Sequence, residues 1–155
     1  MEDKKAILKL LAPKAVLKAM TAEAELAVPD GKIESGFISI RQFPFRVGRE
    51  SRGTIVDGDF QRSERPRFED RVPDNNLYLV DGAPLLNISR EHFQIESAAE
   101  GYLLVDRGSA CGTTVGGIHV GGNDSGGSAV LKDGDVIGIG TETTPYLYTF
   151  VADLC

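Results

Sequence analysis

Short β-type runs, separated by glycine-containing turns, fill most of this chain and limit what it can fold into. The dipeptides at 30–31, 81–82 and 133–134 are Asp-Gly, and the one at 116–117 is Gly-Gly. Such pairs readily supply the positive φ that tight turns need. The runs that have the character of strands cover residues 25–28, 37–40, 44–47, 77–80, 91–96, 102–105, 113–115, 129–131, 136–139 and 146–151. Because no helical pattern lies between them, the sequence predicts an all-β fold, an antiparallel sandwich or barrel.

The N-terminal segment differs from the rest. Residues 1–24 are rich in alanine, with apolar residues recurring at intervals, which favours helix. Pro13 divides this stretch, so we expect one or two short helical pieces or a loosely docked tail. For 155 residues, one compact domain is the economical interpretation. We place it at residues 25–151, after an N-terminal extension at 1–24 and before a C-terminal tail at 152–155.

Two stretches interrupt the strand pattern. Residues 50–74 are long and highly charged and contain Pro66 and Pro73, so they predict an exposed loop insertion that is partly disordered. Residues 116–127 contain six glycines and predict a mobile surface loop.

The sequence shows no sign of membrane insertion or export. Its apolar runs fall far short of the roughly 20 residues needed to cross a bilayer. Lysines interrupt the apolar positions of the N-terminal segment, so we expect no secretion signal. Two cysteines, Cys111 and Cys155, are too few for a disulfide framework or a zinc site. We therefore expect a reducing, cytoplasmic setting.

The charge of the chain disfavours some partners and favours others. A net charge of −6 disfavours nucleic acid, because an acidic body repels the phosphate backbone. Eight arginines fall within residues 41–71, whereas residues 72–155 hold only Arg90, Arg107 and Lys132 against eleven acids. A small cationic pocket on an acidic surface selects a focused anion rather than a long polyanion.

The common catalytic and cofactor motifs are absent: the sequence has no GxSxG, P-loop, HExxH or CxxC pattern. A triad of Ser89, His92 and Asp106, or a pair of Cys111 and His119, can be imagined from the only two histidines. Strand alternation, however, turns His92 away from the apolar face of its strand, so we expect it to brace a neighbouring loop by hydrogen bonding. We therefore expect no enzyme, no metal site and no cofactor.

Three polar segments stand at the ends of predicted strands. Arg49 closes one strand, Ser89 and Arg90 come just before the next, and residues 108–113 form a tight polar turn. An arginine fork and a small hydroxyl that converge on one point suit a tetrahedral anion, since guanidinium binds phosphate oxygens bidentately and hydroxyl or N–H groups satisfy the rest. Phosphate is the natural candidate for the ligand.

These segments, taken in order, carry a family resemblance. The sequence has Gly48-Arg49, then Ser89-Arg90-Glu91-His92, then Gly112-Thr113 followed by Gly116-Gly117, and finally Leu131-Lys132-Asp133-Gly134-Asp135-Val136-Ile137. Each piece is common alone, but the four in order resemble a forkhead-associated (FHA) domain over roughly residues 25–151. The resemblance implies a β-sandwich of about eleven strands. It also implies that loops at one end bind phosphothreonine peptides, without catalysis.

The resemblance further implies roles for individual residues in binding the phosphate. Arg49 and Ser89 would hold the phosphate, and Arg90 would lie beside it. Gly48 and His92 match architectural positions of the family, the glycine allowing a tight approach and the histidine fixing the loop geometry.

The resemblance implies peptide contacts around the second and third segments. Ala110, Cys111, Gly112 and Thr113 belong to the turn that would grip the peptide backbone. Asn87 falls where the family selects the residue three places after the phosphothreonine. The implied partner is a phosphothreonine-containing protein or peptide, with no nucleic acid and no membrane.

Cys111 departs from the family pattern, which usually has asparagine before the Gly-Thr pair. A thiol is a poor substitute for an amide that donates and accepts at once. A neutral hydrogen bond contributes about 0.5–1.5 kcal/mol, whereas a bond to a charged group contributes about 1.5–3 kcal/mol. We therefore expect weaker or less selective binding rather than none. The alternative is a degenerate FHA scaffold that binds a protein partner independently of phosphorylation.

Overall fold

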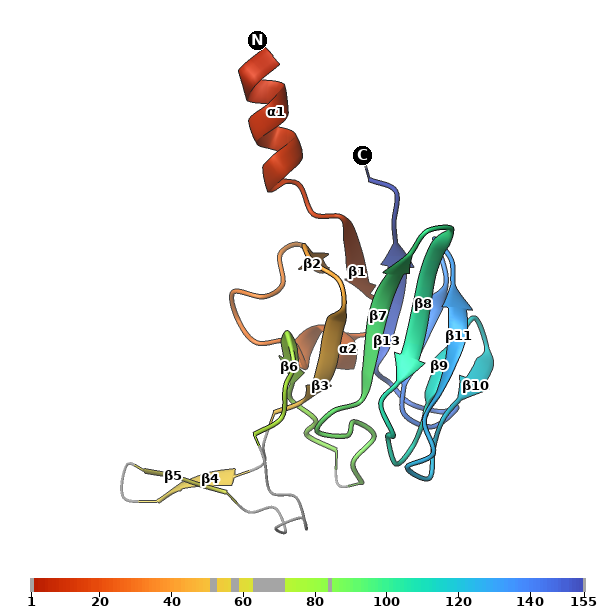
Figure 1. Cartoon of the computed structure of the whole chain (residues 1–155). Coiled ribbons are helices and arrows are strands. Elements are labelled where there is room, and N and C mark those ends of the chain that lie inside the picture. Colours follow the sequence, from red (N-terminus) through yellow and green to blue (C-terminus); the bar gives the residue numbers. More distant parts are fainter. Residues whose placement is uncertain (1, 51–52, 57–58, 63–71, 84, 155) are drawn as a thin grey trace.

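The computed structural model describes residues 2–50, 53–56, 59–62, 72–83 and 85–154, in which two β-sheets pack face to face (Figure 1). One sheet has six strands, in the spatial order β10 (Ile118–Val120), β9 (Thr113–Val115), β12 (Val136–Ile139), β13 (Leu147–Val151), β1 (Ala15–Ala19) and β2 (Phe37–Ile40). The other has five, in the order β11 (Gly127–Leu131), β8 (Gly101–Asp106), β7 (Phe93–Ala98), β3 (Phe45–Arg49) and β6 (Leu77–Leu79). These strands confirm the predicted all-β sandwich. Strand pairing is antiparallel as predicted, except that β3 and β6 run parallel.

The core lies between the sheets and is filled by alternate side chains of each strand. In β13, Tyr148 and Phe150 point inward while the residues between and beside them are half-buried. Phe93 of β7 and Leu104 of β8 fill the same core from the other sheet. The Tyr148 hydroxyl keeps a polar partner, because it donates to the carbonyl oxygen of Ala24 at 2.7 Å. Burial raises the pKa of this tyrosine.

The N-terminal segment contributes a strand that the sequence did not predict. A helix, α1 (Glu2–Leu11), is present as expected, but residues 15–19 form β1, paired with β13 on one side and β2 on the other. Leu17 lies opposite Phe150 and is buried. Pairing on both edges overrides the helical preference of the alanines and lysine here. The sandwich therefore begins ahead of the predicted boundary at residue 25.

The strand predicted at residues 25–28 is wrong. The structure has a short helix there, α2 (Ala22–Leu26). Thr21 is its N-cap, and its hydroxyl oxygen accepts a hydrogen bond from the Ala24 N–H at 3.0 Å. Glu23 lies in the first turn, where an acidic side chain stabilises the N-terminus of a helix.

The glycine-rich segment at 116–127 is only partly a loop. Gly116 and Gly117, with φ of 55° and 86°, form the turn of a hairpin that joins β9 to β10. In the charged insertion, β4 (Gly53–Val56) pairs with β5 (Asp59–Arg62) in a hairpin that extends from the sandwich (Figure 1). Of the loop predicted at 50–74, residues 51–52, 57–58 and 63–71 lie outside the described residues. None of the described helices is long and apolar enough to cross a bilayer.

Candidate functional site

The predicted site residues gather at one end of the sandwich. Strands β3 and β8 end there, at Arg49 and Asp106, and β7 and β9 begin there. The segments that lead into β7 and β9, around residues 85–92 and 107–112, meet at the lower end of the view in Figure 1. The antiparallel order of β3, β7 and β8 therefore places polar groups from distant parts of the sequence side by side.

Arg49, the last residue of β3, lies against the segment that carries Ser89. Its backbone N–H donates to the Ser89 carbonyl oxygen at 3.0 Å, and its Nε donates to the Ile88 carbonyl oxygen at 2.8 Å. Only 5% of Arg49 is exposed. These bonds orient the guanidinium along the loop, so Arg49 and Ser89 are brought together as predicted from the order of the motifs.

Gly48 permits this close approach. A Cβ atom at this position would lie 2.0 Å from the Arg90 carbonyl oxygen and 2.6 Å from Nδ2 of Asn75. No side chain fits at that distance, so the glycine sets how closely β3 approaches the loop.

Ser89 and Arg90 follow one another on the loop that precedes β7. The Ser89 hydroxyl oxygen accepts a hydrogen bond from the Ala110 N–H at 3.0 Å. Its own hydrogen can be donated to an anion. Arg90 is 5% exposed, and its carbonyl oxygen accepts a hydrogen bond from Nδ2 of Asn75 at 2.7 Å.

His92 joins two of the loops from within. Its Nδ1 accepts a hydrogen bond from the Ser89 N–H at 2.9 Å, so Nε2 carries the proton and donates to the Gly112 carbonyl oxygen at 2.7 Å. Burial lowers the pKa of His92, although the bond to Gly112 and the charge of Asp106 oppose that effect. With both ring nitrogens bonded to the main chain, the imagined triad of Ser89, His92 and Asp106 is not assembled.

A buried carboxylate shapes the turn at 108–113. Asp106 accepts hydrogen bonds from the N–H groups of Gly108 and Ser109 at 3.0 and 2.8 Å and from the hydroxyls of Ser109 and Thr113 at 2.6 and 2.8 Å. Thr113 is fully buried and Gly112 is also buried, so both brace the turn from inside. Within the predicted peptide-gripping turn, Ala110 is exposed and Cys111 is half-buried.

Cys111 sits in a shallow hollow beside this turn. Its Sγ lies 3.5 Å from the Leu86 carbonyl oxygen. The hollow has a volume of about 370 Å³ and is lined by Cys111, His119, Thr141, Glu142 and Thr143. The structure therefore places Cys111 and His119 along the same hollow.

Asp81 organises the segment before Ser89, and sequence reasoning missed it. Its carboxylate accepts hydrogen bonds from the N–H of Asn87 at 2.7 Å, from the N–H of Ile88 at 3.0 Å and from the Tyr146 hydroxyl at 2.8 Å. Burial alone would raise the pKa of Asp81, but these hydrogen bonds outweigh it and hold the pKa below its usual value. The Asp-Gly pair at 81–82 suggested only a turn.

Asn87 is thereby fixed at a defined place. It packs on Gly140, where a Cβ atom would lie 2.7 Å from Cβ of Asn87. Gly140 has φ of 125° and its N–H donates to the Gly112 carbonyl oxygen at 3.0 Å. Asn87 therefore lies beside Gly140, which is bonded to the turn that carries Cys111.

A second cluster of side chains supports the loop that carries Arg90, and no sequence pattern indicated it. Asn75 donates to the Arg90 carbonyl oxygen and accepts from Nη1 of Arg107 at 2.8 Å. Arg107 in turn forms an ion pair with Glu91. These side chains link the start of β6, the site loop and the end of β8.

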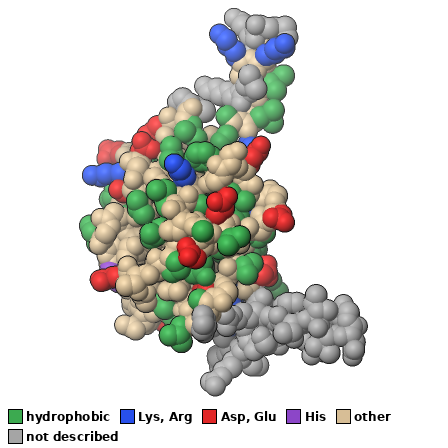
Figure 2. Space-filling model, turned by 180° about the vertical axis from the view of Figure 1, so that it is seen from behind, with side chains coloured by type: hydrophobic (Ala, Val, Ile, Leu, Met, Phe, Trp, Pro, Cys, Tyr) green, Lys and Arg blue, Asp and Glu red, His purple; other side chains and the backbone are tan. Residues whose placement is uncertain are grey.

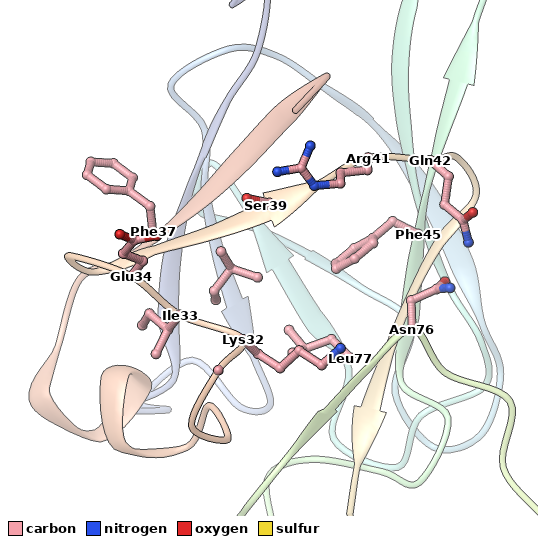
Figure 3. A pocket seen from close by; sticks show the side chains of 12 residues that line it. Lys32, Ile33, Glu34, Phe37, Ser39, Arg41, Gln42, Phe45, Asn76 and Leu77 are labelled. Atoms are coloured by element: carbon pink, nitrogen blue, oxygen red, sulfur yellow. The ribbon is translucent and has the colours of Figure 1, made fainter. Parts of the chain in front are cut away.

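The larger hollows of the described residues lie elsewhere. One of them has a volume of about 660 Å³ and lies between the edge strands β2 and β6. Figure 3 shows side chains of its lining, among them Arg41, Phe45 and Leu77. This hollow does not include any of the predicted phosphate-binding residues.

Comparison with known proteins places the chain in one family. The sequence profile of the FHA domain family matches residues 45–140. The structure of Mycobacterium tuberculosis EmbR in complex with a low-affinity phosphopeptide has a TM-score of 0.50 and 18% identity, over 97% of this chain and 29% of that one. This chain thus spans less than a third of that protein. The FHA domain of a Chlamydia trachomatis protein has a TM-score of 0.48 and 19% identity, over 88% and 95% of the two chains.

A further solved structure has the same family name. The FHA domain of a hypothetical Arabidopsis thaliana protein has a TM-score of 0.49 and 20% identity, over 91% of this chain and 85% of that one. Identities this low indicate a similar fold and nothing about function. No curated protein matches the chain.

Proposed function

This chain belongs to the FHA domain family, and we propose that it binds phosphothreonine in a partner protein and so mediates a phosphorylation-dependent interaction. The family is one of phosphopeptide-binding modules, which supports phosphopeptide binding as the general function. Threonine as the phosphorylated residue, and the residues that hold it, are the finer part of the proposal.

The observation that carries the proposal is the pair of hydrogen bonds made by His92. They hold the loop of Ser89 against the turn of Gly112, while Arg49 is tied to the same loop through Ile88. The groups that would bind a phosphate are thus fixed before the ligand arrives, which lowers the ordering cost of binding.

The phosphate would be bound by charge-assisted hydrogen bonds. Arg49 and Arg90 supply guanidinium N–H groups and Ser89 supplies a hydroxyl. Each bond to a charged group contributes about 1.5–3 kcal/mol. Around this cationic spot the chain is acidic overall, which favours a focused dianion over an extended polyanion.

A second candidate function is a scaffold that binds its partner without regard to phosphorylation. Cys111 favours it, because the thiol occupies the position of an amide that would hold the ligand's main chain. Capture of one partner that phosphatase treatment leaves unchanged would support this alternative.

Titration of a degenerate phosphothreonine peptide library tests the leading proposal. We expect wild type to bind phosphothreonine peptides, to bind the phosphoserine versions markedly less well, and to ignore unphosphorylated peptides. R49A should abolish binding. R46A is the matched control, because Arg46 lies on the same strand and pairs at the surface with Asp74 at 3.8 Å.

Equal binding by wild type and R49A would reject the proposal. Because Arg49 is buried, S89A provides a second variant with a smaller structural change. Thermal unfolding of each variant separates loss of the site from loss of the fold.

A further inference from the structure

Helix α1 extends from the sandwich with part of its apolar surface uncovered. Figure 1 shows it projecting from the body, and Figure 2 shows hydrophobic side chains along it and basic side chains near its far end. Ile7 and Leu11, four residues apart and so on one face, are 54% and 62% exposed. A helix of ten residues is marginal in water by itself and needs a packing partner.

A groove with matching chemistry lies at the same end of the sandwich. Its volume is about 770 Å³, and it is lined by Lys14, Phe43, Pro44, Glu96, Ser97, Tyr102, Asp153 and Leu154. The rings of Phe43 and Tyr102, with centroids 5.5 Å apart, form part of its apolar lining. Glu96 and Asp153 add carboxylates. Burial, together with the charges of Asp153 and Asp133, raises the pKa of Tyr102.

The charges of the helix and of the groove are complementary. Helix α1 carries three lysines and two acids, a net charge of +1. The groove is lined by one lysine and two acids, a net charge of −1. Lys4 and Lys5 are exposed on α1, so the helix offers both an apolar face and cations to an apolar groove with acidic residues.

We propose that two copies of this chain form a two-fold dimer in which α1 of each copy lies in the groove of the other. The Arg41 guanidinium donates to the carbonyl oxygen of Leu11, and three residues separate the helix from β1. This contact fixes the C-terminal end of α1 to the sandwich, and Figure 1 shows the rest of the helix projecting away from it, where a second copy can meet it. Exchange of identical elements makes the interface self-complementary, as two-fold symmetry requires.

The dimer leaves the phosphate site open. The groove residues Phe43 and Tyr102 lie at the beginnings of β3 and β8, whereas Arg49 and Asp106 end these strands. The two sites of a dimer would therefore face away from the interface. If the proposed function holds, such a pair favours a partner with two phosphothreonines.

Size-exclusion chromatography with light scattering on the full chain tests the dimer. Protein concentrations up to about 100 μM allow a dissociation constant in the micromolar range to be detected. We expect wild type to have the mass of two chains. The double variant I7D/L11D should have the mass of one. L26D is the matched control and should remain dimeric, because Leu26 is 82% exposed on α2, away from the groove.

Charge reversal gives a second, more specific measurement. K4E/K5E places acids opposite acids, and E96K/D153K places cations opposite cations, so each variant alone should be monomeric. Mixing the two variants should restore a dimer, because each helix then meets a groove of opposite charge. Circular dichroism should show both variants folded.

A wild type with the mass of one chain would overturn the proposal, and so would a mixture of folded variants that stays monomeric. Packing of α1 on its own body would give that result. Neither outcome bears on the proposed function, since phosphopeptide binding by a monomer is measured separately.

Discussion

His92 and Gly112, twenty residues apart, are joined by a hydrogen bond of 2.7 Å from Nε2 of the ring to the carbonyl oxygen. The same ring accepts the N–H of Ser89 through Nδ1. One buried side chain therefore sets the spacing between the loop that would bind phosphate and the turn that would face the peptide. That spacing depends on the histidine being neutral, because Nδ1 must accept a hydrogen bond.

Stability should fall as the pH drops below the ordinary pKa of histidine, 6.5. Burial lowers the pKa of His92 in the folded state, so in this range the unfolded chain binds more protons and the free energy of unfolding decreases with decreasing pH. The slope for one proton is at most about 1.4 kcal/mol per pH unit. Urea denaturation between about pH 5 and pH 7.5 measures it, in a range above the usual carboxylate pKa values.

The variant H92Q isolates this contribution, because its side chain does not titrate. At neutral pH its free energy of unfolding should be lower than that of wild type. Across the range this free energy should also change less with pH. H119Q, with the exposed histidine replaced, should keep the wild-type slope. A wild type whose stability does not change over this range would contradict the interpretation.

Gly48→Ala should weaken both the fold and phosphopeptide binding. The added Cβ would lie 2.0 Å from the Arg90 carbonyl oxygen, so β3 and the site loop must move apart. Overpacking of this kind costs about 1–3 kcal/mol. Thermal unfolding and peptide titration measure the two effects.

Gly82→Ala is the control for that change. A Cβ atom at Gly82 meets nothing within 4 Å, and the residue is exposed. It should leave stability and binding close to wild type. If the two alanine variants behave alike, the close approach at Gly48 does not position the site.

Asn75→Ala should lower phosphopeptide affinity although Asn75 is not proposed to touch the ligand. The variant removes the donor to the Arg90 carbonyl oxygen and the acceptor for Arg107. A buried group left without its partner costs about 1–3 kcal/mol. Calorimetric titration beside thermal unfolding shows whether affinity falls. Q42A removes an amide from an exposed position and should change neither affinity nor stability. If the Asn75 variant binds the peptide as well as wild type does, Asn75 does not position the site.

The site residues that stand at strand ends could be predicted from the sequence. The residues that support the site through contacts with distant segments could not. Arg49, Ser89 and His92 stand at strand boundaries, so alternation and turn signals were enough to bring them together. Asp81 and Asn75 act through Tyr146 and Arg107, partners that no local pattern reveals.

The strand β1 was missed for a related reason. Its residues favour helix by composition, and they are extended because β13 and β2 pair with both of their edges. The intrinsic helix or strand preference of a segment decides its structure only where pairing with other strands does not oppose that preference, as in α1. The same rule accounts for α2, where the capping threonine and an acidic first turn outweighed a short apolar run.

Cys111→Asn should increase phosphopeptide affinity. Cys111 is half-buried in the turn beside Ala110, where an amide could both donate to and accept from the main chain of a bound peptide. One added neutral hydrogen bond contributes about 0.5–1.5 kcal/mol, a gain of roughly two- to tenfold in affinity. C111S, which removes the thiol without supplying an amide, should gain less. A peptide titration in which the asparagine variant binds no better than wild type would show that this position does not hold the ligand's main chain, and that the turn at 108–113 serves the fold alone.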